Sequence, residues 1–347
     1  MPVYVCLHAV GTRAYPARCA LARLTTITMT LPEISPSASS SDSLPRRQAL
    51  RWLGGGMGAA TLLGLTACGS APPAPTQDKP PARPVVLRKP RLALALGGGA
   101  ARGFAHVGAL EVLEEAGIRP DIVVGTSAGS VVGSIYASGL RGKTLRDAAQ
   151  GLDKNAITDW QVPFLNRGLL RGAALERFIN QQVGNRPIQA MPIKLGIVAT
   201  DLKSGQGILF RSGNTGQAVR ASSAVPGVFE PVRIGSSEYV DGGLVAPVPV
   251  RYARQLGGDV VVAIDISSEP TAEAASSQAQ VVLKTFSIMG RNINTNELKT
   301  ADVVLRPALA GVSSADFGNP ERSIEAGRAA MRQALPRIGP ALAQGVR

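Results

Sequence analysis

The sequence predicts an α/β protein in which a mostly parallel sheet is covered by helices on both faces. Short apolar runs that fit buried strands alternate with amphipathic helical stretches from about residue 91 onward, and this alternation is typical of parallel sheets. Glycine-rich turns follow three of the predicted strands. Because ligand sites in such sheets lie at the carboxyl ends of the strands, we expect the functional site at these turns.

The first predicted elements are two strands, each followed by a glycine turn and a helix. "RLALAL" (Arg91–Leu96) is a continuous apolar run, as in a buried strand. Over Gly103–Ala116 the apolar residues recur on one face, and Gly117 ends the pattern, which predicts a helix. "DIVVG" (Asp121–Gly125) is the second strand, and a helix over Ala128–Ser138 follows it.

The rest of the chain continues the alternation. Helices are predicted over residues 145–153, 172–183, 215–225, 278–292 and 323–335. Strands are predicted within residues 193–202, 205–212, 238–243, 259–267 and 301–307. We therefore expect a domain over residues 91–256 and an α/β extension over residues 257–347 that packs on the same domain.

The N-terminal segment is typical of an export signal rather than of a folded domain. Residues 1–43 lack a sustained hydrophobic period and are interpreted as a disordered leader or a mis-assigned start, with Met29 as a candidate true start. Residues 44–67 fit a lipoprotein-type export signal. Arg46 and Arg47 are followed by an apolar stretch that is short for a membrane span, and the paired arginines resemble a twin-arginine signal.

Cys68 is the predicted lipidation site. The run "LTAC" that it ends resembles the bacterial lipobox, and residues 68–90 add a proline-rich tether. The alternative is a buried helix with an ordinary cysteine. The lipoprotein interpretation predicts a lipid-anchored protein of the cell envelope, at the periplasmic face of the outer membrane because Gly69 replaces the aspartate that retains lipoproteins at the inner membrane.

Charge and cysteine content narrow the function classes. The formal net charge is +13, which suits contact with phospholipid headgroups. We expect no nucleic-acid partner, because the sequence has no zinc pattern and no basic stripe with interleaved aromatics. The three cysteines, Cys6, Cys19 and Cys68, all precede the predicted domain, so that neither a disulfide nor a thiolate metal cluster can hold it together.

The second glycine turn carries a candidate nucleophile. Ser127 is the centre of "GTSAG", which fits G-x-S-x-G between an apolar strand and a helix, the arrangement of a nucleophile elbow. Such a serine needs a base, yet the chain holds only two histidines, His8 and His106. His8 lies in the leader, and His106 lies so near the first glycine loop that we interpret it as a structural residue of the helix.

The base is therefore expected to be a carboxylate. Asp241 is the best placed, because "DGG" follows a predicted strand, while Asp201 and Asp265 also lie at strand ends and stay candidates. An aspartate can accept the proton directly when partial burial raises its pKa toward neutrality. A Ser–Asp dyad of this kind depends strongly on its oxyanion donors.

The first glycine turn, "GGGAARGFAHVG" over residues 97–108, is a candidate anion cradle. Consecutive glycines let backbone N–H groups converge on one point, and the helix that follows adds its positive dipole end. A dinucleotide-binding loop is the alternative. Against it, Ala100 interrupts the G-x-G-x-x-G frame and no acidic residue ends the next strand.

Together, "GGGAARG", "GTSAG" and "DGG" in this order resemble the patatin-like phospholipase family, and "ATDLKSG" and "VRASSAVPGVFEPV" resemble segments of its bacterial members. The resemblance covers about Leu92–Leu256. It implies a three-layer α/β/α fold and a Ser–Asp dyad that hydrolyses acyl esters of phospholipids or other lipids without metal or other cofactor. A catalytically inactive lipid-binding or scaffold lipoprotein of the same fold is the alternative function.

The resemblance also assigns site residues. Ser127 is the implied nucleophile and Asp241 the implied base. The implied oxyanion donors are the N–H groups of Gly98, Gly99 and Ala100, with Arg102 ordering their loop. The remaining motif residues are Gly103, Gly125, Gly129, Gly242 and Gly243. Alanine at position 100, where many members have glycine, is expected to keep a negative φ.

Overall fold

The computed structural model describes residues 88–152, 159, 168–267 and 278–344. The predicted leader, export signal, Cys68 and most of the tether lie outside these residues. Among the residues described, no helix combines the length and the apolar character that crossing a bilayer requires.

The sheet has the strand order β5-β6-β3-β2-β1-β7-β8, and β4 pairs with β3 away from this path. The strands are β1 (Leu92–Leu96), β2 (Ile122–Thr126), β3 (Lys194–Asp201), β4 (Gly207–Phe210), β5 (Val232–Ile234), β6 (Ser237–Asp241), β7 (Val260–Ile264) and β8 (Val303–Leu305). The central pairs β3–β2, β2–β1, β1–β7 and β7–β8 are parallel. β4, β5 and β6 pair antiparallel, so that the sheet is mixed at one end.

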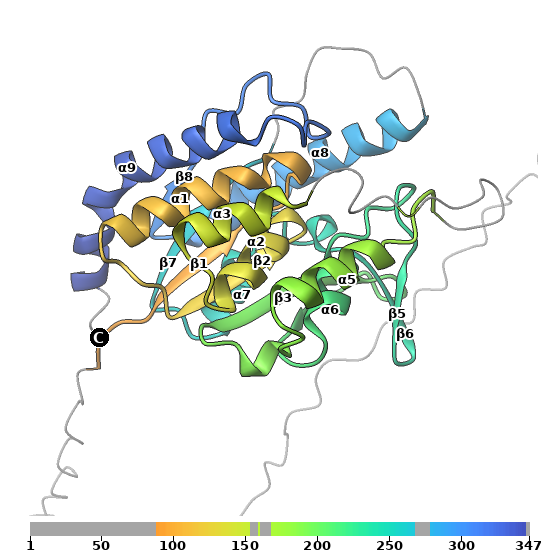
Figure 1. Ribbon diagram of the computed structural model, residues 1–347, viewed down its shortest axis with the longest axis horizontal. Coiled ribbons are helices and arrows are strands. Elements are labelled where there is room, and N and C mark those ends of the chain that lie inside the picture. The colour runs from red at the N-terminus through yellow and green to blue at the C-terminus, as the bar shows by residue number, and fades with distance from the viewer. Residues whose placement is uncertain (1–87, 153–158, 160–167, 268–277, 345–347) are drawn as a thin grey trace, which may run out of the picture. The chain divides into compact units, whose positions relative to one another are not determined.

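Helices cover both faces of this sheet, which makes the three-layer α/β/α class that the sequence predicts (Figure 1). The α-helices are α1 (Phe104–Glu115), α2 (Ala128–Ala137), α3 (Gly142–Gln150), α5 (Ala173–Gln182), α6 (Thr215–Ser222), α7 (Val250–Gln255), α8 (Gln278–Glu297) and α9 (Pro320–Gln344). The 3₁₀ turns are η1 (Ala100–Gly103), η2 (Ile188–Ala190), η3 (Gly242–Leu244) and η4 (Leu298–Thr300). The sequence patterns missed α7 and β5, which are short.

The alternation of side chains along the strands divides the core between the two faces. Leu92, Leu94 and Leu96 of β1 pack with apolar residues of α1, α2 and α9. Ala93 and Ala95 point to the other face, where they pack with α7 and η4. This period of two is what a strand buried on both faces requires.

α1 and α9 lie side by side in the outer layer (Figure 1) and meet through two glycines. A Cβ added to Gly108 would lie 1.9 Å from the carbonyl oxygen of Ile324, and one added to Gly327 would lie 1.9 Å from that of Ala105. The two helix backbones are therefore in direct contact, at a separation that only glycine permits.

We expect Gly327→Ala to lower the free energy of unfolding by about 2 kcal/mol, because the added methyl group must push the helices apart. Gly339→Ala in the same helix is the matched control, since an added Cβ meets nothing within 4 Å there, and it should leave stability unchanged or slightly raised. Urea unfolding of both variants measures the difference. Equal effects would contradict the glycine contact.

Candidate active site

Ser127 lies in the turn between β2 and α2, in a backbone conformation rare for a residue with a side chain. Its φ is 51° and its ψ is −121°, and such strain at a non-glycine residue usually occurs at a functional position. The motif positions that flank Ser127 require glycine, because a side chain there would clash with neighbouring backbone. A Cβ at Gly125 would lie 2.4 Å from the carbonyl oxygen of Gly129, and one at Gly129 would lie 2.1 Å from that of Leu96.

A second serine holds the backbone of this turn. The N–H of Ser127 donates to Oγ of Ser222 at 2.9 Å, and that hydroxyl donates in turn to the carbonyl oxygen of Val198 at 2.6 Å. Sequence reasoning did not single out Ser222. Its position in "RASSAV", at the end of a short helix, gave no signal that it contacts the elbow.

Strand register brings Asp241 to Ser127. Thr126 pairs with Val198 across β2 and β3, and Asp241 pairs with Ala199 across β6 and β3. Ser127 and Asp241 are therefore level with each other on either side of β3. The Ser127 side chain lies close enough to the Asp241 carboxylate to lower its pKa, so that the structure brings the predicted nucleophile and the predicted base together.

Burial sets the acidity of the Asp241 carboxyl. It is 4 % exposed, and this desolvation raises its pKa from 3.8 to about 6. Two neighbours partly oppose the rise: the N–H of Gly243, which donates a hydrogen bond to the carboxylate at 2.6 Å, and the side chain of Ser127. Asp241 is thus mostly ionised at neutral pH and able to accept a proton.

The other two candidate carboxylates have different partners. Asp201 accepts hydrogen bonds from the N–H and hydroxyl of Ser204, which lower its pKa. Asp265 accepts from Ser267 and pairs with Arg306 at 3.4 Å. Both stabilise loops at the ends of their strands, whereas Asp241 is the carboxylate whose pKa the Ser127 side chain lowers.

The first glycine loop differs from the expectation in two details. The N–H of Gly98 donates to the carbonyl oxygen of Pro247 at 2.9 Å, so this donor is engaged within the fold and is not free for an oxyanion. Ala100 has a φ of +50°, which corrects the expected negative φ. Arg102 is buried and its Nε donates to the carbonyl oxygen of Gly99 at 3.3 Å, which fixes the loop from inside.

The remaining motif glycines are sites of close approach around the elbow. An added Cβ at Gly103 would lie 2.8 Å from that of Ala128, and one at Gly242 would lie 2.2 Å from the carbonyl oxygen of Val198. Gly243 supplies the N–H that reaches the Asp241 carboxylate. The three glycine turns are therefore packed against one another.

His106 is fully buried beneath the first glycine loop. Its Nε2–H donates to the carbonyl oxygen of Gly97 at 2.8 Å, and burial lowers its pKa to about 4. Nδ1 has no partner among the residues described. The ring is neutral at physiological pH and supports the loop rather than Ser127.

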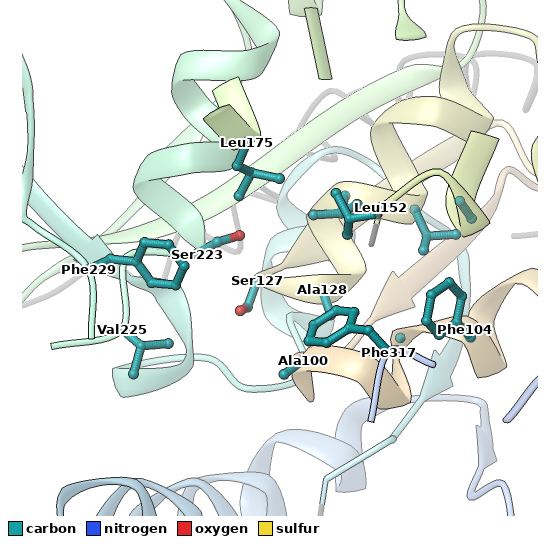
Figure 2. A pocket seen from close by; sticks show the side chains of 14 residues that line it. Ala100, Phe104, Ser127, Ala128, Leu152, Leu175, Ser223, Val225, Phe229 and Phe317 are labelled. Carbon is teal, nitrogen blue, oxygen red and sulfur yellow. The ribbon is translucent and has the colours of Figure 1, made fainter. Parts of the chain in front are cut away.

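Ser127 opens into an apolar cavity of about 110 Å³ (Figure 2). The walls include three phenylalanines, Phe104, Phe229 and Phe317, together with aliphatic side chains of α2, α5 and neighbouring loops. Among the described residues that line the cavity, Ser127 and Ser223 carry a side-chain hydroxyl. Oγ of Ser223 has no hydrogen-bond partner among the described residues. The cavity suits a hydrocarbon chain whose polar end lies at Ser127.

Residues 94–254 match the family model described as patatin-like phospholipase. This segment is a patatin-like phospholipase domain. The family is one of lipid ester hydrolases, and the match favours this class over the dinucleotide-binding alternative. The described residues contain no group of three or more His, Cys, Asp or Glu side chains that could hold a metal ion.

Proteins similar to the patatin-like domain occur in bacteria and mammals. An uncharacterized NTE family protein of Mycobacterium tuberculosis is 32% identical over 204 residues, which are 58% of this chain and 56% of that protein. Patatin-like phospholipase domain-containing protein 6 of Mus musculus is 32% identical over 191 residues, 53% of this chain and 14% of that protein. The chain thus spans little more than half of the mycobacterial relative. The crystal structure of VipD from Legionella pneumophila aligns with a TM-score of 0.47 at 14% identity, covering 74% of this chain and 67% of that one.

The buried carboxyl makes stability depend on pH. Because the folded pKa of Asp241 is about 6 and its ordinary value 3.8, the folded state holds more protons than the unfolded state between these values, and stability falls as the pH rises through them. Asp241→Asn should therefore raise the free energy of unfolding by up to about 3 kcal/mol at neutral and alkaline pH. The gain should disappear in acid, and thermal unfolding across pH measures it. A gain independent of pH would contradict the raised pKa.

The positive φ at Ala100 predicts an unusual response to glycine. Ala100→Gly should leave stability unchanged or raise it by up to about 1 kcal/mol, because relief of the left-handed strain offsets the greater entropy of glycine in the unfolded chain. Ala101→Gly, at a buried neighbour without a positive φ, should lower stability by about 1 kcal/mol. Urea unfolding compares the two, and a loss of similar size in both would show that Ala100 is unstrained.

Proposed function

We propose that the protein is a serine acyl hydrolase that cleaves the acyl esters of phospholipids or related lipids with Ser127 as nucleophile and Asp241 as base. The observation that carries the proposal is the position of Ser127 beside a buried carboxylate with a raised pKa, at the wall of an apolar cavity. A carboxylate with a pKa near 6 is a competent general base at neutral pH.

In the first half-reaction, Asp241 accepts the proton of Ser127 while Oγ attacks the ester carbonyl carbon. The acyl chain occupies the cavity, and we assign the oxyanion to the N–H groups of Gly99 and Ala100, the next donors after the engaged Gly98. Each such donor typically contributes a few kcal/mol. The intermediate collapses when the C–O bond to the alcohol breaks, and Asp241 returns the proton to the departing oxygen.

In the second half-reaction, Asp241 deprotonates a water molecule that attacks the acyl-enzyme carbonyl. The tetrahedral intermediate releases the free acid, and the proton held by Asp241 returns to Ser127. Every proton transfer in this scheme passes through the single carboxylate. No imidazole is needed, in keeping with the position of His106.

The cellular setting is a further part of the proposal. Arg46, Arg47 and the "LTAC" run ending at Cys68 support an exported lipoprotein, anchored in the cell envelope at the periplasmic face of the outer membrane. The net charge of +13 favours a membrane with anionic headgroups. Both features come from the sequence.

We expect Ser127→Ala to abolish hydrolysis of a p-nitrophenyl ester and to prevent covalent labelling by a fluorophosphonate probe. His106→Gln is the control and should cost much less than Ser127→Ala, because the glutamine amide can keep the hydrogen bond to Gly97 and the imidazole takes no part in proton transfer. In the unmodified protein, kcat/KM should rise with pH and level off above about pH 6, as Asp241 ionises. Turnover by Ser127→Ala would refute the nucleophile, and an unlabelled, inactive protein that binds lipid would support the scaffold alternative.

A further inference from the structure

α8 is held against the rest of the domain by contacts that follow one another from its C-terminal end toward its N-terminal end. The carbonyl oxygen of Thr300, just after the helix, accepts a hydrogen bond from Arg254 at 3.0 Å. Glu297 pairs with Arg251 at 2.7 Å. These contacts place the C-terminal end of α8 beside α7, on the sheet face that α7 covers.

Closer to its N-terminus, α8 reaches a loop that contacts the first glycine turn. Asn294 accepts from the N–H of Val248 at 3.2 Å, and a Cβ on Gly290 would lie 3.3 Å from Pro247. Pro247 is the residue whose carbonyl oxygen binds Gly98. α8 therefore reaches the carboxyl edge of the parallel strands at Gly290, beside the active site.

The helix continues past this edge. From Gly290 back to Val281 it extends about 14 Å further, at 1.5 Å per residue, and Figure 1 shows these first turns projecting beyond the other helices. Five large apolar side chains of these turns are exposed. Exposed fractions of 38–52 % are found at Val281, Val282, Leu283, Ile288 and Met289, which we call the α8 patch.

The α8 patch includes the side of the helix that faces away from the protein. Val281 and Ile288 are seven residues apart and lie opposite Gly290 and Asn294, which face inward. On the same outward side but closer to the C-terminus, Asn292 and Thr295 are polar and exposed. Apolar residues thus occupy the outward side only where α8 extends past the active-site edge.

Charge and position favour a lipid surface as the occupant. Residues 278–296 contain Lys284 and Arg291 and no acidic residue, and helices that combine an apolar side with basic residues bind phospholipid interfaces. Leu202, which directly follows β3 at the same edge of the sheet, is also exposed and is followed by the exposed Lys203.

We propose that the α8 patch inserts into the surface of a phospholipid bilayer and holds the mouth of the active site against it. The choice of occupant rests on the proposed lipid substrate, while the binding itself does not require catalysis. The patch would act in addition to any anchor at Cys68, by orienting the domain on the membrane.

The test places an environment-sensitive fluorophore on α8. In the full chain with Cys6, Cys19 and Cys68 changed to serine, Thr285→Cys places the label within the α8 patch. Thr295→Cys places it on the polar part of the same side, and both threonines are exposed and bond the carbonyl oxygen four residues earlier. Vesicles of phosphatidylcholine, with and without phosphatidylglycerol, are the probe.

We expect a blue shift of the label at position 285 on addition of vesicles, greater with phosphatidylglycerol, and little or no shift at 295. The same result in a Ser127→Ala background shows binding without catalysis, so that failure of the esterase leaves this proposal intact. Equal shifts at both positions, or no shift at either, would overturn the proposal. A shift at position 285 that grows with protein concentration before vesicles are added would also overturn it, because it would indicate that a second copy of the chain covers the patch.

A kinetic comparison gives an independent result. Val281→Ser with Ile288→Ser should lower hydrolysis of vesicle phospholipid by about tenfold while leaving hydrolysis of a soluble short-chain ester unchanged. Asn292→Ser with Thr295→Ser, on the same side of the helix, should change neither. An equal fall toward both substrates in the first variant, or no fall toward vesicles, would contradict the proposal.

Discussion

The approach of Asp241 to Ser127 depends on one strand register. Asp241 is the last residue of β6, and its pairing with Ala199 brings its carboxyl level with the elbow. The backbone of Asp241 is held twice more, by its N–H to Ala224 and by its carbonyl oxygen to Thr200. A shift by one residue would turn the carboxyl to the opposite face of the sheet, and the buried charge would lose its partner.

Two non-glycine residues with positive φ lie on the two turns that face each other in this site, Ser127 at 51° and Ala100 at +50°. Each conformation is maintained by its surroundings. Ser222 binds the backbone of the elbow, and Arg102 binds the carbonyl oxygen next to Ala100. Strain that neighbouring contacts maintain fixes reactive groups before substrate arrives, which reduces the reorganisation needed during reaction.

Local patterns were enough to predict the parallel strands, the long helices and Ser127, because each depends on residues close in sequence. The choice among Asp201, Asp241 and Asp265 depended on which strands are neighbours, and β6 pairs antiparallel through a register that no local pattern encodes. Ser222 and the engaged N–H of Gly98 could not be foreseen for the same reason. Their partners, Ser127 and Pro247, are distant along the chain.

The position of β7 has a consequence for protein production. β7 lies between β1 and β8, and the carbonyl oxygen of its Ile264 binds Gly97 in the first glycine loop. Ala101 in the same loop binds Ser314, still further along the chain. An expression boundary drawn at residue 254, where the family match ends, would remove the neighbour of β1 and leave that strand as an open edge able to pair with other molecules. A truncated protein of this kind is expected to aggregate rather than to fold.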